Sequence, residues 1–134
     1  MYLKHISRRV VILGTLLIWI IKFIIRPLVP IPPSLRPLVG FAPNLIGSFL
    51  LPFGACWFFQ RYFRLQTTRD LGFTCSFGLL LVIINEYLQL IPVFGRTFDY
   101  LDIVSSVVGV FCGYLVFARL TATQVSEMKT LPDR

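Results

Sequence analysis

The chain has 134 residues, a hydrophobic fraction of 56%, a charged fraction of only 14% and a mean hydropathy of +0.78. Soluble domains carry about 25% charged residues, so the composition excludes an ordinary soluble protein and indicates an integral membrane protein with a single domain over residues 1–134. The net charge is +7, yet the basic residues lie in short gaps between apolar segments. We therefore interpret them as topology signals and contacts with membrane lipids, and predict no nucleic-acid binding.

Four apolar segments follow one another along the chain, at residues 10–25, 39–59, 71–91 and 103–120. Each is close to the ~20 residues that a membrane-spanning helix needs. Backbone polar groups in hydrocarbon must be satisfied within the protein, so segments of this length are expected to be helical. The sequence therefore predicts an all-α fold, a four-helix transmembrane bundle. The first segment follows a basic stretch, as the apolar part of a signal peptide does, but no small-x-small cleavage site comes after it. We therefore expect it to be retained as a helix.

The segments between and after these helices differ in character. Residues 26–37, RPLVPIPPSLRP, contain five prolines, and because proline lacks the backbone N–H this stretch is expected to form an irregular, extended loop. Pro52 lies inside the second apolar segment and is expected to kink it. Residues 121–134 are polar and are expected to be frayed.

The distribution of Lys and Arg predicts the topology. Nine of the 13 basic residues lie in the N-terminal stretch, in the 60–70 loop and at the C-terminal end, whereas three lie in the 26–37 and 92–102 loops. Cytoplasmic loops carry the excess of basic residues. The sequence therefore predicts that both termini are cytoplasmic and that the proline-rich loop and the 92–102 loop face outward.

A polar stretch, NEYLQLIPVFGRTFDYLDIVSS from Asn85 to Ser106, interrupts the apolar pattern and holds three of the six acidic residues. A glutamate inside a membrane helix usually faces protein or water, and Gln89 shares the face of Glu86 because it lies three residues on. Arg96 is the only cation of this loop, and a guanidinium group can grip a carboxylate or a phosphate with two hydrogen bonds. These groups are predicted to meet at the outer membrane face.

The fourth segment carries a helical stripe that has polar side chains at one end and glycines at the other. Its members recur at spacings of three and four and are Asp99, Asp102, Ser106, Gly109 and Gly113. The two glycines form GxxxG, which lets a neighbouring helix approach closely. Either aspartate is also a candidate cap for the start of this helix.

The second segment offers a comparable stripe of Asn44, Gly47, Leu51 and Gly54. We predict helix packing at the small positions Gly47, Gly54, Gly109 and Gly113. Such packing is expected to bring together a ligand-binding polar site of Asn44, Glu86, Gln89, Arg96, Asp99, Asp102 and Ser106.

Signatures of established chemistry are missing from the sequence. It contains no GxSxG, HExxH, P-loop or dinucleotide fingerprint. The single histidine, His5, lies in a basic stretch, and the three cysteines lie inside apolar segments without metal-ligand spacing. We therefore predict no metal site and no cofactor.

The polar and glycine motifs resemble the VanZ-like family of small bacterial membrane proteins. The motifs that carry the resemblance cover about half of the chain and are NLIGSFLLPFG (Asn44 to Gly54), EYLQ (Glu86 to Gln89) and RTFDYLDIVSSVVGVFCG (Arg96 to Gly113). The family commonly has Asn where Ser106 stands, and Ser is the shorter of the two. The resemblance implies a multi-pass protein of the bacterial cytoplasmic membrane and a cell-envelope context linked to teicoplanin resistance, and it implies no particular reaction.

Three functions remain open from the sequence. In the first hypothesis, the outward-facing polar site binds a lipid-linked or cell-wall-related ligand or a partner protein, with Arg96 holding a phosphate or carboxylate. Alternatively, Glu86, Asp99 and Asp102 supply the acid and base of a membrane hydrolase or transferase that acts on a lipid-linked substrate. In the third hypothesis the polar network only stabilises the bundle. The sequence leaves the oligomeric state open.

Overall fold

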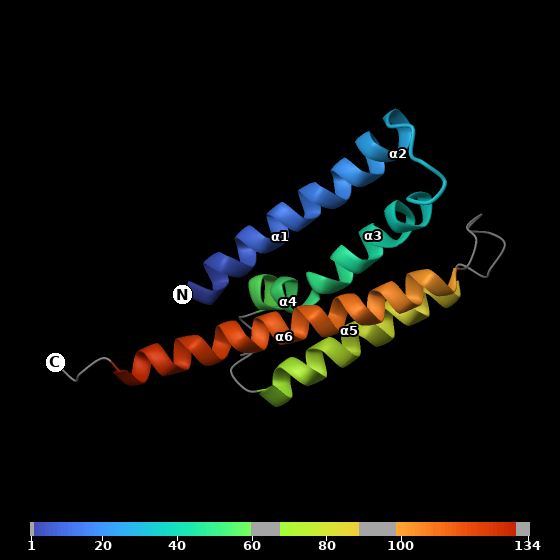
Figure 1. Cartoon of the computed structure of the whole chain (residues 1–134). Coiled ribbons are helices and arrows are strands. Elements are labelled where there is room, and N and C mark those ends of the chain that lie inside the picture. Colours follow the sequence, from blue (N-terminus) through green and yellow to red (C-terminus); the bar gives the residue numbers. More distant parts are fainter. Residues whose placement is uncertain (1, 60–67, 89–98, 131–134) are drawn as a thin grey trace.

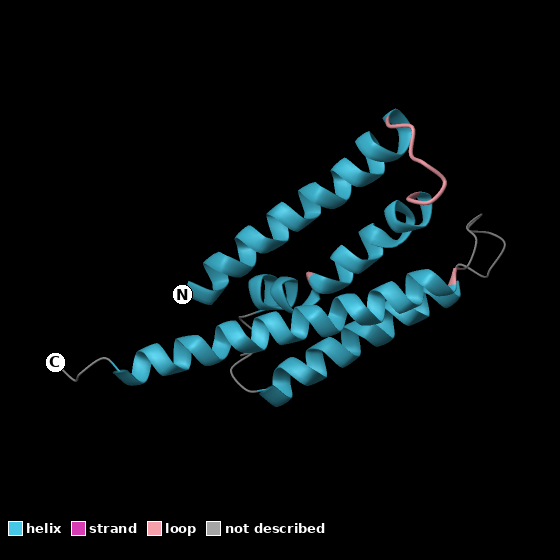
Figure 2. Cartoon of the chain, viewed as in Figure 1, coloured by secondary structure: helices cyan, strands magenta, loops and turns pink. Residues whose placement is uncertain are grey.

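A computed structural model describes residues 2–59, 68–88 and 99–130, and these ranges contain helices and short turns without any strand (Figures 1 and 2). The first span is a continuous helical run of α1 (Tyr2–Ile20), the π-helical turn η1 (Ile21–Ile25) and α2 (Arg26–Leu28). The remaining elements are α3 (Arg36–Phe49), α4 (Leu51–Phe59), α5 (Thr68–Leu88) and α6 (Tyr100–Thr130). The predicted all-α class is confirmed.

Four helical stretches are long and apolar enough to cross a membrane: Leu3–Leu28, Arg36–Phe59, Arg69–Leu88 and Tyr100–Thr123. They bear large apolar side chains on the outside of the bundle, where lipid is the natural surrounding. Phe73, for example, is 71% exposed. The start of α1 and the end of α6 lie toward the same end of the molecule (Figure 1).

Several boundaries differ from the sequence prediction, and the first helix already begins at Tyr2 instead of residue 10. Arg26–Leu28 is helical and belongs to the first span, because the π-helical turn directly before Pro27, closed by the bond from Arg26 N–H to Ile21 O, accommodates a proline inside a membrane helix. At the other end, α6 continues to Thr130 instead of ending at residue 120. The expectation that the polar residues after 121 are frayed is thus wrong as far as Thr130.

The second span is broken in the middle. Helix α3 ends at Phe49 and α4 begins at Leu51, two residues from the kink predicted at Pro52. A residue at position 52 of a regular helix would donate its N–H to the carbonyl of Ser48, and proline cannot. The span therefore changes direction at Leu50 (Figure 1), and α3 has its main contacts with α6 whereas α4 has its main contacts with α1.

Helices α3 and α6 pack with their backbones in close approach. A Cβ added at Gly109 would collide with the carbonyl oxygen of Leu45, and one added at Gly113 would collide with that of Phe49. Lipid tails are as apolar as leucine, so helices in a bilayer associate through such close fit rather than through hydrophobic exclusion. The two glycines therefore form a closed α3–α6 seam.

At the break, leucines of the second span enter glycine positions of its neighbours. Leu50 lies against Gly14 of α1, where an added Cβ would come within 2.6 Å of Leu50 Cδ1. Leu51 lies in the same way against Gly78 of α5. These contacts attach α1 and α5 to the middle of the second span.

The glycines that the sequence assigns to packing on the second span do not make such contacts. A Cβ added at Gly54 would meet no described atom within 4 Å, and one at Gly47 would meet only Ile18 Cδ1, at 3.9 Å. The expected close packing at Gly47 and Gly54 is therefore replaced by open space. The physical reason is that their helix face borders a cavity instead of a neighbouring backbone.

The core lies between α4, α5 and α6, toward the end of the bundle that holds the start of α5. It consists of Phe53, Cys56, Leu71, Cys75, Val110 and Phe117. The rings of Phe53 and Phe117 meet edge to face, with centroids 5.4 Å apart. This arrangement is favourable for aromatic rings, and the cluster fills one end of the bundle with apolar side chains.

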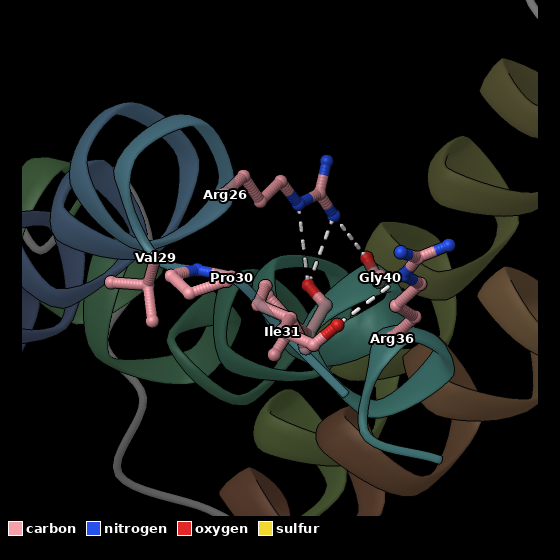
Figure 3. A pocket seen from close by; sticks show the side chains of 7 residues that line it. Arg26, Val29, Pro30, Ile31, Arg36 and Gly40 are labelled. Atoms are coloured by element: carbon pink, nitrogen blue, oxygen red, sulfur yellow. Dashed lines mark hydrogen bonds between the residues drawn. The ribbon is translucent and has the colours of Figure 1, made fainter. Parts of the chain in front are cut away.

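A proline also lies inside α3, at Pro43, and it leaves the carbonyl of Val39 without its intrahelical donor. The guanidinium group of Arg26 takes this place. Its Nε and Nη2 donate to Val39 O at 3.3 and 3.0 Å, and Nη2 also donates to Gly40 O (Figure 3). Arg26 thus ties the end of the first span to the start of α3 while satisfying a carbonyl that hydrocarbon would leave unbonded.

Candidate functional site

An open cavity of about 550 Å³ lies among all four spans, next to the break in the second span. We call it the interhelical groove. Its apolar walls include Val11, Ile18, Leu50, Leu51, Leu81 and Val82. Its polar side chains are Thr15, Asn44, Ser48, Asn85, Glu86 and Ser106.

The polar side chains reach the groove from four helices, with Thr15 on α1 and the others on α3, α5 and α6. Asn44 and Ser48 are one helical turn apart on α3, so they share a face. Asn85 and Glu86 belong to the last turn of α5, and Ser106 lies in the second turn of α6. Because α5 and α6 run in opposite directions, the end of one and the start of the other lie at the same end of the bundle (Figure 1).

Glu86 brings a carboxyl group into the wall of the groove. Its side chain is only 4% exposed. A carboxyl group at this depth in a membrane span is expensive and usually marks a position that works with a polar ligand or a polar partner. Its place beside Asn85 makes this end of the groove polar, while most of the remaining lining is apolar.

Two neighbouring serines on α6 have different surroundings although both are buried. The Ser105 hydroxyl donates to the carbonyl oxygen of Asp102 at 2.9 Å. Ser106 is 1% exposed and lines the groove, and its Oγ has no hydrogen-bond partner among the described residues. A buried polar group without a hydrogen bond costs about 1–3 kcal/mol, so the Ser106 hydroxyl is a position that a bound polar group would stabilise.

The structure brings three of the predicted site residues together on the groove, namely Asn44, Glu86 and Ser106. Two others lie elsewhere. Asp99 is exposed and caps α6, accepting the N–H of Leu101 on Oδ1 at 2.9 Å. Asp102 is half-buried in the first turn of α6 and is not part of the groove lining. Gln89 and Arg96 lie outside the described residues.

Sequence reasoning missed three polar residues of the groove. Asn85 directly precedes Glu86 and belongs to the same polar stretch, and Ser48 lies one turn after Asn44, so both carried a signal that could have been used. Thr15 is a single hydroxyl in an apolar segment. Such a residue can bond to its own helix backbone, and its sequence context does not distinguish that case from a groove position.

The groove supplies oxygen and amide groups but no cluster suited to a metal ion. Within the described ranges, no three His, Cys, Asp or Glu side chains lie together. The cysteines are free, with Cys56 and Cys75 buried in the core and Cys112 exposed. The chemistry available in the groove is therefore hydrogen bonding by a carboxyl group, carboxamides and hydroxyls.

No family model matches the chain, and no match is found among curated proteins or solved structures. The resemblance to the VanZ-like family stays a prediction from the sequence motifs.

Proposed function

We propose that the interhelical groove binds a lipid-linked or cell-wall-related ligand and that the protein acts as a binding protein in the bacterial cytoplasmic membrane. The observation that carries this proposal is the combination of an open 550 Å³ groove with apolar walls and a polar end that includes a buried, unbonded hydroxyl at Ser106. A link to teicoplanin resistance rests on the VanZ-like resemblance alone.

The lining of the groove fits an amphiphile. Apolar side chains of α1 and α5, such as Ile18 and Leu81, provide a surface for a hydrocarbon chain. Asn44, Glu86 and Ser106 face the more polar part of such a molecule. Because the groove is open and the spans around it are apolar, a lipid-linked ligand can enter it from the bilayer.

The polar end suits a ligand with hydroxyl or amide groups. A carboxylate and carboxamide oxygens accept hydrogen bonds, while serine hydroxyls and carboxamide nitrogens donate them. No Lys or Arg is among the described residues that line the groove. Sugar hydroxyls or peptide amides therefore match this lining better than a phosphate does. Arg96, the predicted phosphate ligand, lies outside the described residues.

The proposal includes a topology with both termini in the cytoplasm and the polar end of the groove facing outward. It is supported by the excess of basic residues in the terminal segments and in the 60–70 loop. In a cysteine-free background, we expect a cysteine at Ser34 to react with a membrane-impermeant maleimide in intact cells. A cysteine at Arg69 is expected to react only after permeabilisation, and the reverse pattern would contradict the topology.

The described geometry favours binding over acid–base catalysis. An acid–base pair needs a second titratable group that faces the same bound atoms as Glu86. Asp99 is exposed and occupied as a helix cap, and Asp102 is not part of the groove lining. The groove thus presents Glu86 as the one carboxyl group among its described residues.

The experiment that tests the proposal measures binding to the purified full-length protein in phosphatidylcholine nanodiscs. The probe is a polyprenyl-diphosphate-linked disaccharide peptide, the lipid-linked precursor of the bacterial cell wall. Glu86→Gln keeps the size of the side chain, and we expect it to weaken binding about 10-fold, because a hydrogen bond to a charged group is worth about 1.5–3 kcal/mol. Asp70→Asn makes the same change in charge at the other, exposed end of α5 and should leave the affinity unchanged. Absence of binding, or equal effects of the two variants, would contradict the proposal.

A further inference from the structure

A second, separate cavity lies at the junction of α2 and α3. It has a volume of about 410 Å³ and shares no residue with the interhelical groove. Two arginines, Arg26 and Arg36, line it together with the apolar side chains of Val29 and Ile31 (Figure 3). We call it the arginine pocket.

Arg26 is held in place from one side only. Its Nε and Nη2 are engaged by the carbonyls of Val39 and Gly40, which fixes the plane of the guanidinium group. Its Nη1 makes no hydrogen bond to the described residues and points away from both carbonyls (Figure 3). The charge of Arg26 is therefore fixed at the pocket with part of its donor capacity still unused.

Arg36 is held more loosely. Its Nε makes one long hydrogen bond, at 3.4 Å, to the carbonyl oxygen of Ile31. Its Nη1 and Nη2 have no hydrogen bond within the described part of the chain (Figure 3). A guanidinium group with two adjacent free N–H donors has the geometry that grips a phosphate with two parallel hydrogen bonds.

The charge of the pocket is uncompensated. No Asp or Glu is among its described lining residues, so two cations share one concave site and repel each other. An anion in the pocket would remove this repulsion and take up the unused donors. The carbonyls of Val39 and Gly40 lie on the Nε and Nη2 side of the Arg26 guanidinium group. They therefore leave its Nη1 side open to an anion (Figure 3).

The position of the pocket indicates which anion is available. Arg26 lies near the end of the first membrane-length helix, and Arg36 is the first residue of the second. The ends of membrane spans lie at the level of the lipid headgroups. We infer that the arginine pocket binds the phosphate of an anionic lipid headgroup, with Val29 and Ile31 contacting the adjoining apolar part of the lipid.

Native mass spectrometry of the full-length protein in detergent tests this inference. The lipids are phosphatidylglycerol and phosphatidylcholine with matched acyl chains, and inorganic phosphate is the soluble competitor. Both lipids carry the phosphate, but the two arginines repel the choline cation of phosphatidylcholine. We therefore expect phosphatidylglycerol to bind about 10-fold more tightly than phosphatidylcholine. Equal affinities for the two lipids would overturn the inference. Displacement of the lipid by an equal concentration of inorganic phosphate would assign the pocket to a free phosphate and overturn it as well.

The discriminating variant is Arg36→Gln, because the Arg36 side chain makes only one, long hydrogen bond to the described residues and its loss should not disturb the fold. It should abolish the preference for phosphatidylglycerol. The matched control is Arg69→Gln, which removes the same charge from an exposed position at the start of α5 and should keep the preference. If Arg36→Gln misfolds, Arg36→Lys retains the charge without the fork and should reduce the preference several-fold. An unchanged preference in the folded Arg36 variant would contradict the inference and leave the groove proposal untouched.

Discussion

The two faces of α3 have opposite surroundings, although glycines lie at both. On one face, Gly109 and Gly113 of α6 lie directly against the backbone at Leu45 and Phe49 and close the seam. On the other face, Asn44 and Gly47 border the open groove. The comparison shows that a small residue closes an interface only when a neighbouring backbone comes to meet it, and that otherwise it leaves room for a ligand.

Pro43 and Pro52, the two prolines in the interior of the second span, show the same contrast. Each removes one backbone N–H from the helix. At Pro43 the freed carbonyl of Val39 is bonded by Arg26, and α3 continues. Near Pro52 the helix is interrupted at Leu50. Leu50 and Pro43 both border the interhelical groove. The irregular backbone of this span thus lies beside the cavity, as expected for non-helical backbone at membrane depth.

The largest effect is expected for a side chain added to the closed seam. Gly109→Val would force a Cβ and two methyl groups into the carbonyl of Leu45, so the helices must separate. We expect the free energy of unfolding to fall by about 3 kcal/mol, the upper range for overpacking. The matched control, Gly54→Val, places the same side chain where no described atom lies within 4 Å, and its effect should stay within about 0.5 kcal/mol. Denaturant unfolding in micelles measures both, and equal losses would remove the distinction between the two faces.

A medium effect is expected at the bridge between Arg26 and α3. Arg26→Ala should lower the free energy of unfolding by about 2 kcal/mol, because it removes charge-assisted hydrogen bonds and leaves Val39 O without a donor. In a Pro43→Ala background, the restored N–H at position 43 can bond to Val39 O, so the loss should shrink by about 1 kcal/mol. A double-mutant cycle measures this coupling, and strictly additive effects would show that Arg26 does not compensate for the proline.

Much of the architecture could be predicted from the sequence. Hydropathy predicts the four membrane-length helices, and Pro52 predicts the site of the break to within two residues. Glu86 in an apolar segment marks a polar position whatever its neighbours are. These features depend on single segments, so no knowledge of packing is needed to predict them.

The partner of each helix face could not be predicted in this way. The spacing of Gly47 and Gly54 is the same whether the stripe meets a backbone or a cavity, and the structure shows the cavity. Gly14 and Gly78 are isolated glycines without a repeating pattern, so nothing in the sequence indicates that Leu50 and Leu51 pack against them. Asp99 and Asp102 fall on the same stripe as Ser106, but only Ser106 is deep enough along α6 to reach the groove.

The smallest expected effect is also the most direct test of the proposed ligand site, because it compares two adjacent buried serines. Ser106→Ala removes a groove hydroxyl that makes no hydrogen bond to the described residues, so we expect unchanged or slightly higher stability. Affinity for the lipid-linked cell-wall precursor should fall about 3- to 10-fold, the worth of one hydrogen bond. Ser105→Ala removes a hydroxyl bonded to a carbonyl of its own helix, Asp102 O, so it should leave affinity unchanged and change stability by no more than about 0.5 kcal/mol.

Measuring binding and thermal unfolding on both variants therefore decides whether the groove binds a ligand. The account predicts that Ser106→Ala loses affinity at full stability while Ser105→Ala keeps its affinity. If Ser106→Ala instead destabilises the protein and leaves ligand affinity unchanged, the polar residues of the groove serve only to hold the bundle together, and the proposed function is contradicted.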